Sequence, residues 1–206
     1  MSTGLSFPQA AAALVEIGRE AHGRGWLPAT SGNLSCRIDA ETLAITVSGR
    51  HKGRLSIADI MRVDLDGRPL DPQRPSAETL LHTQLYRRFS GVGAVLHTHS
   101  VNATVLSRLA GESLPLNDLE LLKAFRGIET HELTLRLPVF ANDQDMVRLA
   151  GRVASCLQTE PSLPGYLIAG HGLYSWGASM DEAARHLEAF EFLFECELAT
   201  KRVSAP

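Results

Sequence analysis

Residues 92–100 read VGAVLHTHS, a short apolar run that ends in two histidines. A short apolar run beside a glycine is typical of a buried strand. Side chains two apart on a strand project from the same face, so His97 and His99 can converge on one metal ion. The tripeptide alone leaves open the alternative that both imidazoles are ordinary core or surface side chains.

His171 is the candidate for a third ligand. It follows the apolar strand predicted at residues 166–169, and Gly170 and Gly172 on either side of it carry no bulk. Three neutral imidazole nitrogens with one open position are typical of a catalytic zinc site, whereas structural sites are closed by four protein ligands. We therefore interpret these three histidines as a metal site.

Hydrophobic periodicity predicts an α/β fold in which helices cover a sheet, with residues 1–206 as one domain. A helix opens the chain and a β meander follows it; helices and short strands then alternate. The expected helices cover 6–24, 76–89, 102–109, a short piece from Asn117, 143–157 and 181–201. The expected strands cover 34–38, 43–47, 61–65, 92–97, 132–140 and 166–169.

Composition excludes several classes of function. The chain has 206 residues and a net charge of −3, with 20 Lys and Arg against 23 Asp and Glu, so it lacks the basic excess of an electrostatic nucleic-acid binder. No apolar run has the roughly 18 residues of a membrane helix, and the first twenty residues do not resemble a signal peptide. Three widely spaced cysteines suit a reducing compartment, so we expect a cytoplasmic protein without membrane or nucleic-acid partners.

Two loops are candidates for binding an anion. Residues 30–33 (TSGN) precede a predicted strand, and residues 48–53 (SGRHKG) follow another. Loops of this kind can direct backbone N–H groups, Lys and Arg at a phosphate, but many such clusters are only turns. Ser76 adds a third candidate, because we predict it as the N-cap of a helix, where free N–H groups attract anions.

Two carboxylates permit both a structural and a chemical role. Glu120 stands three residues after Asn117, which is the spacing of a capping box. Glu78 falls in the first turn of the helix predicted after Ser76, where a negative charge is favourable in any protein. The sequence pattern alone favours the structural role for each.

Five ordered motifs resemble the class II aldolase/adducin family across nearly the whole chain. Within this family the segments 74–78, 97–100, 119–128 and 171–177 are most similar to the dehydratases that act on 5-methylthioribulose 1-phosphate. The five motifs are Thr30-Ser31-Gly32-Asn33, Thr46-Val47-Ser48-Gly49, Pro75-Ser76-Ala77-Glu78, His97-Thr98-His99 and Gly170-His171-Gly172.

The resemblance implies roles for individual residues. It implies one Zn²⁺ per subunit, bound by the three histidines, and Glu120 as the catalytic acid/base. Glu78 matches a position where class II aldolases carry a glutamate that binds metal or moves protons. Ala77 departs from a serine that many aldolases have there, which either weakens the phosphate pocket slightly or shifts part of the phosphate binding to Lys52. The implied substrate-binding residues are Asn33, Ser48, Gly49, Lys52, Ser76 and Glu78, and the implied metal ligands are His97, His99 and His171.

The resemblance also implies an α/β/α sandwich with a mainly antiparallel sheet, assembled as a homotetramer with sites between subunits. The implied activity is zinc-dependent dehydration of 5-methylthioribulose 1-phosphate to 2,3-diketo-5-methylthiopentyl 1-phosphate, a step of methionine salvage. The alternative is a class II sugar-phosphate aldolase or epimerase of the fuculose or ribulose phosphate type. A non-catalytic interaction domain like the adducin head would have no need of three converging imidazoles.

Overall fold

Eight strands form one sheet in the computed structural model, which describes residues 5–204. In chain order they are β1 (Asn33–Arg37), β2 (Thr42–Thr46), β3 (Ile60–Asp64), β4 (Ala94–Thr98), β5 (Ser113–Leu116), β6 (Leu135–Phe140), β7 (Gly165–Ile168) and β8 (Gly172–Gly177). Across the sheet the order is β3-β2-β1-β4-β8-β7-β6-β5. Within the described residues each neighbouring pair is antiparallel except β6 with β7, which confirms a mainly antiparallel sheet.

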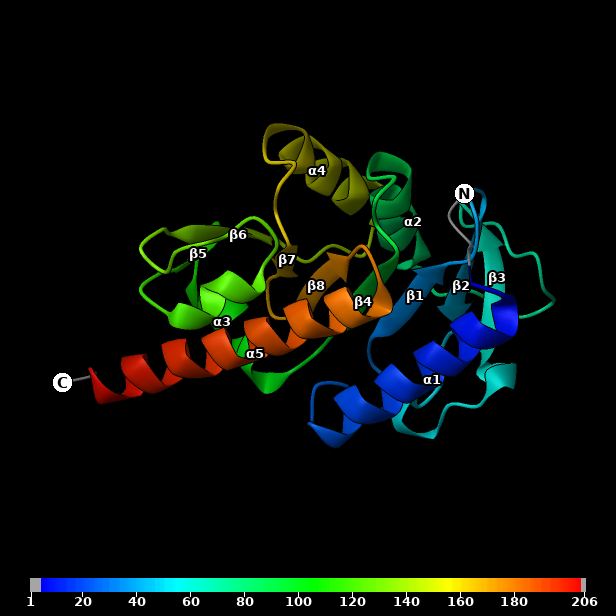
Figure 1. The fold of residues 1–206 in the computed structure, drawn as a ribbon, viewed down its shortest axis with the longest axis horizontal. Coiled ribbons are helices and arrows are strands. Elements are labelled where there is room, and N and C mark those ends of the chain that lie inside the picture. The colour runs from blue at the N-terminus through cyan, green and yellow to red at the C-terminus, as the bar shows by residue number, and fades with distance from the viewer. Residues whose placement is uncertain (1–4, 205–206) are drawn as a thin grey trace.

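Helices cover both faces of this sheet (Figure 1). They are α1 (Phe7–Gly23), α2 (Thr79–Arg88), α3 (Val101–Leu109), α4 (Met146–Thr159) and α5 (Met180–Val203). One hydrophobic core lies between the sheet and α1, α3 and α5, and a second lies between the sheet and α2 and α4. The expected α/β/α sandwich is therefore confirmed.

The central strand β4 sends alternate side chains into the two cores. Ala94 and Leu96 belong to the core under α1, α3 and α5, whereas Val95 belongs to the core under α2 and α4. His97 stands two residues after Val95, so it projects toward α2 and α4. Its ring stacks there on Tyr174 of β8, a member of the same core.

Two strands of the structure have no clear signal in the sequence. β5 reads SLPL and carries Pro115, which a strand accepts at the edge of a sheet, where β5 lies. β8 reads GLYSWG, and the glycines at its ends together with Ser175 hide the apolar pattern of a buried strand. β6 also begins at Leu135 and not at Glu132 as the pattern predicts.

The predicted helix start at Ser76 is wrong. α2 begins at Thr79, and its N-cap residue is Glu78. Residues 76–79 form a turn closed by a hydrogen bond from the Thr79 N–H to the Ser76 carbonyl oxygen at 3.1 Å. The Ser76 hydroxyl accepts a hydrogen bond from the Glu78 N–H at 3.3 Å. The turn places Glu78 at the start of the helix, and Ser76 remains in the loop before it.

The predicted short helix from Asn117 is replaced by a 3₁₀ helix, η3 (Glu120–Ala124), whose N-cap residue is Leu119. Asp118 has φ 58°, which lies in the left-handed region and breaks any helical run from Asn117. The capping box between Asn117 and Glu120 is therefore absent from this part of the described chain, and Glu120 has no role in it.

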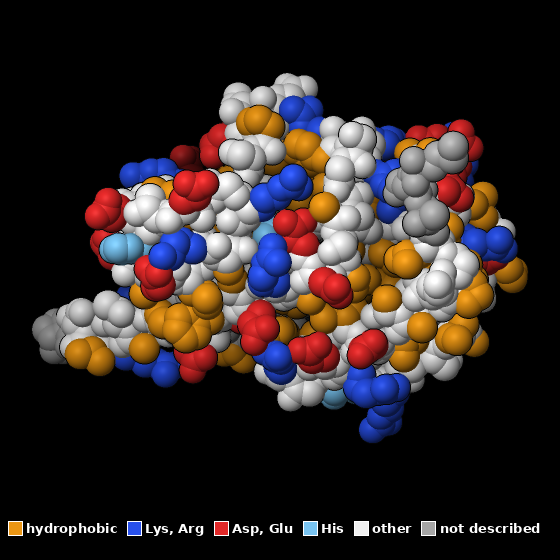
Figure 2. Space-filling model, in the orientation of Figure 1, with side chains coloured by type: hydrophobic (Ala, Val, Ile, Leu, Met, Phe, Trp, Pro, Cys, Tyr) orange, Lys and Arg blue, Asp and Glu red, His pale blue; other side chains and the backbone are white. Residues whose placement is uncertain are grey.

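Charges of both signs are mixed over the surface. Figure 2 shows Lys and Arg interspersed with Asp and Glu on one face of the molecule. Ion pairs also form between charged side chains of the molecule, such as Arg62 with Asp71 at 2.6 Å. This face therefore offers no extended basic patch to a nucleic acid. Across residues 5–204, none of the helices combines the length and the apolar character that a bilayer span requires.

Glu191 on α5 is a buried carboxylate outside the histidine cluster. It is 3% exposed, and neither carboxylate oxygen has a hydrogen-bond partner among residues 5–204. Burial raises the pKa of Glu191 from 4.5 to about 7, and the nearby Ser100 hydroxyl opposes this rise only in part. The native state therefore keeps a proton that the unfolded chain releases between these two pH values.

We expect the native state to lose stability as the pH rises through this window, and to lose no more above it. Glu191→Gln cannot ionise, so its free energy of unfolding should fall by about 3 kcal/mol less than that of the wild type between pH 5 and pH 8. Urea unfolding of both proteins at the two pH values measures the difference. If the free energy of unfolding fell by the same amount in both proteins, the raised pKa of Glu191 would be contradicted.

Candidate metal centre and its pocket

The edge of the sheet where β4 ends and β8 begins brings three distant histidines together. His97 lies on β4, His99 directly follows this strand, and His171 directly precedes β8. β4 and β8 are antiparallel neighbours, with Thr98 paired to Leu173, so the end of one strand lies beside the start of the other. The strand pairing therefore brings His97 and His171 together, although more than seventy residues separate them in the sequence.

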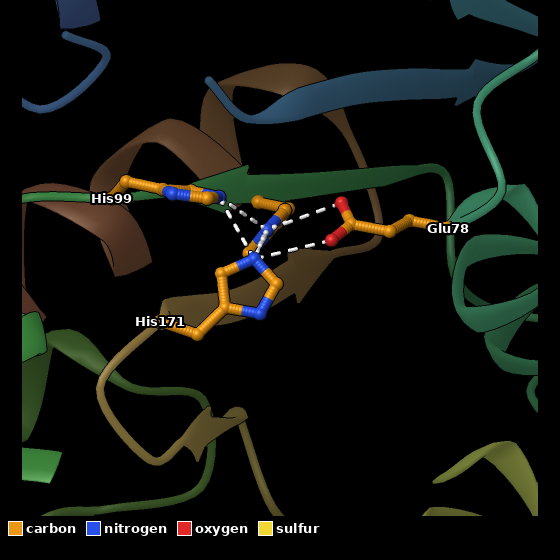
Figure 3. Close-up of side chains that lie close together, drawn as sticks. Glu78, His99 and His171 are labelled. Carbon is orange, nitrogen blue, oxygen red and sulfur yellow. Dashed lines mark hydrogen bonds and ion pairs between the residues drawn. The ribbon is translucent and has the colours of Figure 1, made fainter. Parts of the chain in front are cut away.

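The Nε2 atoms of the three imidazoles point at one another. Nε2 of His99 lies 2.8 Å from that of His97 and 3.1 Å from that of His171, and the third pair is 3.3 Å apart. Glu78 completes the group: its Oε1 is 3.1 Å from His171 and its Oε2 is 3.3 Å from His97. Figure 3 shows Glu78 approaching from the side of α2, with its carboxylate toward the histidines.

The protonation states suit metal binding. Nδ1 of His97 donates a hydrogen bond to the Leu173 carbonyl oxygen at 2.9 Å, which leaves the lone pair on Nε2. Burial holds the pKa of His97 well below its usual value and lowers that of His99 to about 4. Both imidazoles are therefore neutral at pH 7, which is the form that binds a metal.

Glu78 is ionised in this group. Burial by itself would raise its pKa, but the hydrogen bond with His171, together with the nearby imidazoles of His97 and His99, lowers the pKa of Glu78 to about 2. The carboxylate stands at the N-terminus of α2, where the helix dipole favours a negative charge. Glu78 thus brings one full negative charge to the three imidazole nitrogens.

These four donors fit a divalent cation. Each residue offers one atom, and all four atoms lie within 4.8 Å of one another. Three lone pairs that face one another at about 3 Å repel unless a cation lies between them. Nitrogen and carboxylate ligands are those that Zn²⁺ takes. In addition to the three histidines that the sequence predicts, the structure brings the Glu78 carboxylate within 3.3 Å of two of their nitrogens.

A polar cavity of about 450 Å³ opens beside the four donors. Its wall includes all six predicted substrate-binding residues, together with two of the histidines and the whole TSGN loop. The lining residues are Thr30, Ser31, Gly32, Asn33, Ser48, Gly49, Lys52, Arg74, Pro75, Ser76, Ala77, Glu78, His99, Asn142, Gln144, Met146 and His171.

Lys52 is a buried cation in this wall, 1% exposed. Its Nζ donates hydrogen bonds to the carbonyl oxygens of Thr30 at 2.8 Å and Arg50 at 2.9 Å. Burial lowers the pKa of Lys52 to about 8, against the opposing charge of Glu78. The ammonium group therefore links the two predicted anion-binding loops and remains mainly protonated at pH 7.

Some residues of the cavity wall are not predicted from the sequence. Asn142, Gln144 and Met146 come from the loop between β6 and α4 and from the first residue of α4. The sequence places this loop only after a predicted strand, and no motif marks it. The order of strands brings it to the cavity, because β6 lies on the same side of β4 as β8 and β7.

Glu120 is not among the residues that line this cavity. It lies on η3 with a side chain that is 71% exposed and forms an ion pair with Lys123. Its Oε2 is 3.4 Å from Nδ1 of His131, and the hydrogen bond with Lys123 lowers the pKa of Glu120. A single chain therefore does not bring Glu120 together with the three histidines.

Gly32 lines the cavity and lies against the backbone of His97. It has φ +75°, and a Cβ at this position would lie 2.5 Å from the His97 carbonyl oxygen. Gly49 lines the same cavity with φ +73°, but a Cβ there would meet nothing within 4 Å. The two glycines share a left-handed backbone and differ in the space around them.

We expect Gly49→Ala to lower the free energy of unfolding by about 1–2 kcal/mol, the usual cost of a left-handed residue with a side chain. Gly32→Ala should cost about 3 kcal/mol or more, because the strand that carries His97 must also move. Urea unfolding of the two variants measures both effects. Equal losses would show that Gly32 is only a turn residue.

The comparison with known families agrees with this geometry. The profile of the Class II Aldolase and Adducin N-terminal domain matches residues 12–198. The chain belongs to the class II aldolase and adducin family. The family resemblance drawn from the five sequence motifs is therefore confirmed.

Individual members of the family are similar over nearly their whole length. A protein named methylthioribulose-1-phosphate dehydratase from Pseudomonas paraeruginosa is 58% identical over 193 residues, which are 93% of this chain and 94% of that protein. One of the same name from Marinobacter nauticus is 57% identical over 200 residues, 96% of each chain. The L-fuculose-1-phosphate aldolase structure from Thermus thermophilus has a TM-score of 0.77 and 27% identity, and the match covers 95% of this chain and 97% of that one.

Proposed function

We propose that this chain is a zinc-dependent hydro-lyase that dehydrates 5-methylthioribulose 1-phosphate to 2,3-diketo-5-methylthiopentyl 1-phosphate, a step of methionine salvage. The observation that carries the proposal is the convergence of three imidazoles and a carboxylate beside a polar cavity. This site lies in a chain that is 58% identical to relatives named for that activity. The cavity would take the sugar phosphate, the four donors would bind the cation, and a glutamate would serve as the acid/base group.

His97, His99 and His171 would hold one Zn²⁺ per subunit, with Glu78 as a fourth ligand. When bound, zinc supplies Lewis acidity toward the carbonyl and hydroxyl oxygens of the substrate. The Nδ1 hydrogen bond from His97 to the Leu173 carbonyl fixes the orientation of that ring.

The phosphate group would bind between the loops joined by Lys52. Asn33, Ser48, Gly49 and Ser76 line the cavity there and offer backbone N–H groups, hydroxyls and an amide. The Lys52 ammonium adds a positive charge that a bound phosphate would favour further. Contacts to the phosphate hold the sugar in place without touching the carbons that react.

Glu120 would act from a neighbouring subunit. Its exposed side chain on η3 is available to a second copy, and the cavity lacks another free carboxylate once Glu78 binds metal. The helix that follows His99 offers a surface for such a copy. Val101, Val105 and Leu109 form a stripe on α3 and are 71%, 38% and 64% exposed. We therefore retain the proposal of a homotetramer with sites between subunits.

In this arrangement the Glu120 carboxylate removes the proton from C3 of the substrate. The carboxyl group then gives a proton to the hydroxyl at C4, which leaves as water. The enol that remains tautomerises to the 2,3-diketone, so the product equals the substrate less one water. Phosphate and the methylthio group are unchanged.

A class II sugar-phosphate aldolase or epimerase is the second candidate. The position of Glu78 favours it, because this carboxylate already lies against the histidines and could move a proton without a second subunit. The similarity to the fuculose-1-phosphate aldolase structure also agrees with this candidate. The two candidates differ in which bond of the substrate breaks.

Mass spectrometry of the products separates the candidates. The purified, metal-quantified protein is incubated with 5-methylthioribulose 1-phosphate and, separately, with fuculose 1-phosphate and ribulose 5-phosphate. The proposal expects a product lighter by one water from the first compound and little change in the others. Carbon–carbon cleavage or epimerisation of the latter two, with the first unchanged, would overturn it.

Two further features belong to the proposal. We propose that residues 1–206 act as one domain, in keeping with the single sheet of residues 5–204. We also propose that the protein works in the cytoplasm, where its three free cysteines Cys36, Cys156 and Cys196 would remain reduced.

A further inference from the structure

Three aromatic rings are stacked in a row across the sheet, and the first of them is a proposed metal ligand. His97, Tyr174 and Tyr166 occupy directly paired positions on β4, β8 and β7. The ring centroids of His97 and Tyr174 are 4.0 Å apart with an interplanar angle of 14°. Those of Tyr174 and Tyr166 are 4.9 Å apart at 13°. The imidazole thus lies flat against the middle ring of the row.

His97 is held on two sides by one segment of β8. Its Nδ1 donates to the carbonyl oxygen of Leu173, and its ring face contacts the side chain of Tyr174. The hydrogen bond alone still allows the ring to tilt about the N–H···O direction, because that angle is broad. The flat contact with Tyr174 removes this freedom and fixes the direction of Nε2.

Tyr174 is itself held firmly. It is fully buried, with Tyr166 behind it and the edge of His82 at 5.5 Å and 65°. Burial raises the pKa of this phenol, and the nearby carboxylate of Glu78 raises it further. The rings that surround Tyr174 therefore hold its side chain in one orientation.

We propose that Tyr174 is a positioning residue that holds the imidazole of His97 in the plane in which Nε2 faces the metal. This inference rests on the proposed metal site but not on the identity of the substrate. Neighbours that orient a metal ligand commonly change metal affinity when they are replaced. Tyr174 therefore affects the metal without contacting it.

Tyr166 provides a matched control in the same row. It is equally buried and stacks on Tyr174, and its other ring contacts are with Phe140 and Trp176. Replacing either tyrosine with leucine removes a large buried ring from the same core. A purely structural role of Tyr174 would therefore make the two leucine variants alike.

The test measures metal affinity by competition with a chelator for the wild type, Tyr174→Leu, Tyr174→Phe and Tyr166→Leu. We expect Tyr174→Leu to bind Zn²⁺ about 10- to 100-fold more weakly. Tyr174→Phe keeps the flat ring and should remain within about threefold of the wild type, as should Tyr166→Leu. The visible spectrum of the Co²⁺-loaded proteins gives a second readout, which should change only in Tyr174→Leu.

Equal affinity of Tyr174→Leu and Tyr166→Leu for Zn²⁺ would overturn the proposal. Urea unfolding of both variants shows whether they have lost similar stability. If Tyr174→Leu does not fold, Tyr174→Met replaces it, because methionine fills the space without a flat face. Weaker Zn²⁺ binding than in Tyr166→Leu would then support the proposal, and equal binding would overturn it. A wild-type protein that binds no metal would overturn both this inference and the metal site, whereas bound metal without dehydration would refute only the proposed reaction.

Discussion

His99→Ala should lose both its metal and its activity. His99 provides the Nε2 that lies within 3.1 Å of both other imidazole nitrogens, so its removal leaves two nitrogens and a carboxylate for the cation. Loss of the Lewis acid should lower kcat by about a thousandfold or more. Metal analysis of the dialysed protein, together with a turnover assay, measures both effects.

His131→Ala is the control for the metal content. His131 is a half-exposed histidine outside the cluster, next to Glu120. This variant should retain one zinc per subunit. A His99→Ala protein that keeps its metal after dialysis would show that the three imidazoles are not the ligands. A variant that loses its metal but keeps its turnover would refute the role of the metal.

Glu120→Gln should separate chemistry from metal binding. Glutamine has almost the same shape as glutamate but cannot accept the proton from C3. We expect kcat to fall by about 10²- to 10⁴-fold, the usual contribution of a general base, while the zinc content stays at the wild-type level. Glu78→Gln should instead weaken metal binding, because Glu78 contacts two of the three histidines. Normal turnover of Glu120→Gln would refute its assignment as the base.

Mixed assemblies of the proposed homotetramer test where Glu120 acts. Glu120→Gln subunits keep the histidines, and His99→Ala subunits keep Glu120, so each variant alone is inactive. If a site combines the histidines of one subunit with Glu120 of its neighbour, random reassembly at equal amounts restores about a quarter of the wild-type activity. If all the groups act within one chain, the mixture stays inactive, which would refute the placement of Glu120 in a neighbouring subunit.

Local sequence patterns predict much of this fold. The capping box between Ser6 and Gln9 starts α1, within the helix predicted at residues 6–24, and the turn at Gly67 has the positive φ that its Asp-Gly dipeptide favours. Periodic apolar runs also identify α3, α4 and α5 within a few residues of their observed bounds. These features depend on neighbours in the chain, which a single sequence contains.

Features that depend on pairing of distant segments are harder to predict. The glycines that bound β8 conceal it, although it lies between β4 and β7 and carries Tyr174. Pro75 and the turn at Ser76 delay α2 until Thr79, so a helix-capping rule gives the wrong start. The local pattern favours a structural role for Glu78, whereas the packed structure brings its carboxylate to the histidines.

The residues of the candidate site also fall into those that a local sequence pattern identifies and those that only the packing of distant segments brings together. His97 and His99 are recognisable from their spacing on a strand, and His171 from its glycine neighbours. The loop that carries Asn142 and Gln144 has no such mark, because β6 reaches the cavity through the order of strands. Glu120 remains a prediction from family resemblance, since a single chain leaves it outside the cavity.

The position of the metal ion itself tests the account most directly. Crystals of the active, zinc-loaded protein would be measured at the zinc absorption edge, where anomalous scattering locates the ion independently of the protein atoms. We expect one peak per subunit, about 2.0–2.1 Å from Nε2 of His97, His99 and His171 and adjacent to the Glu78 carboxylate. A peak elsewhere, or active crystals without a peak among these three rings, would contradict it.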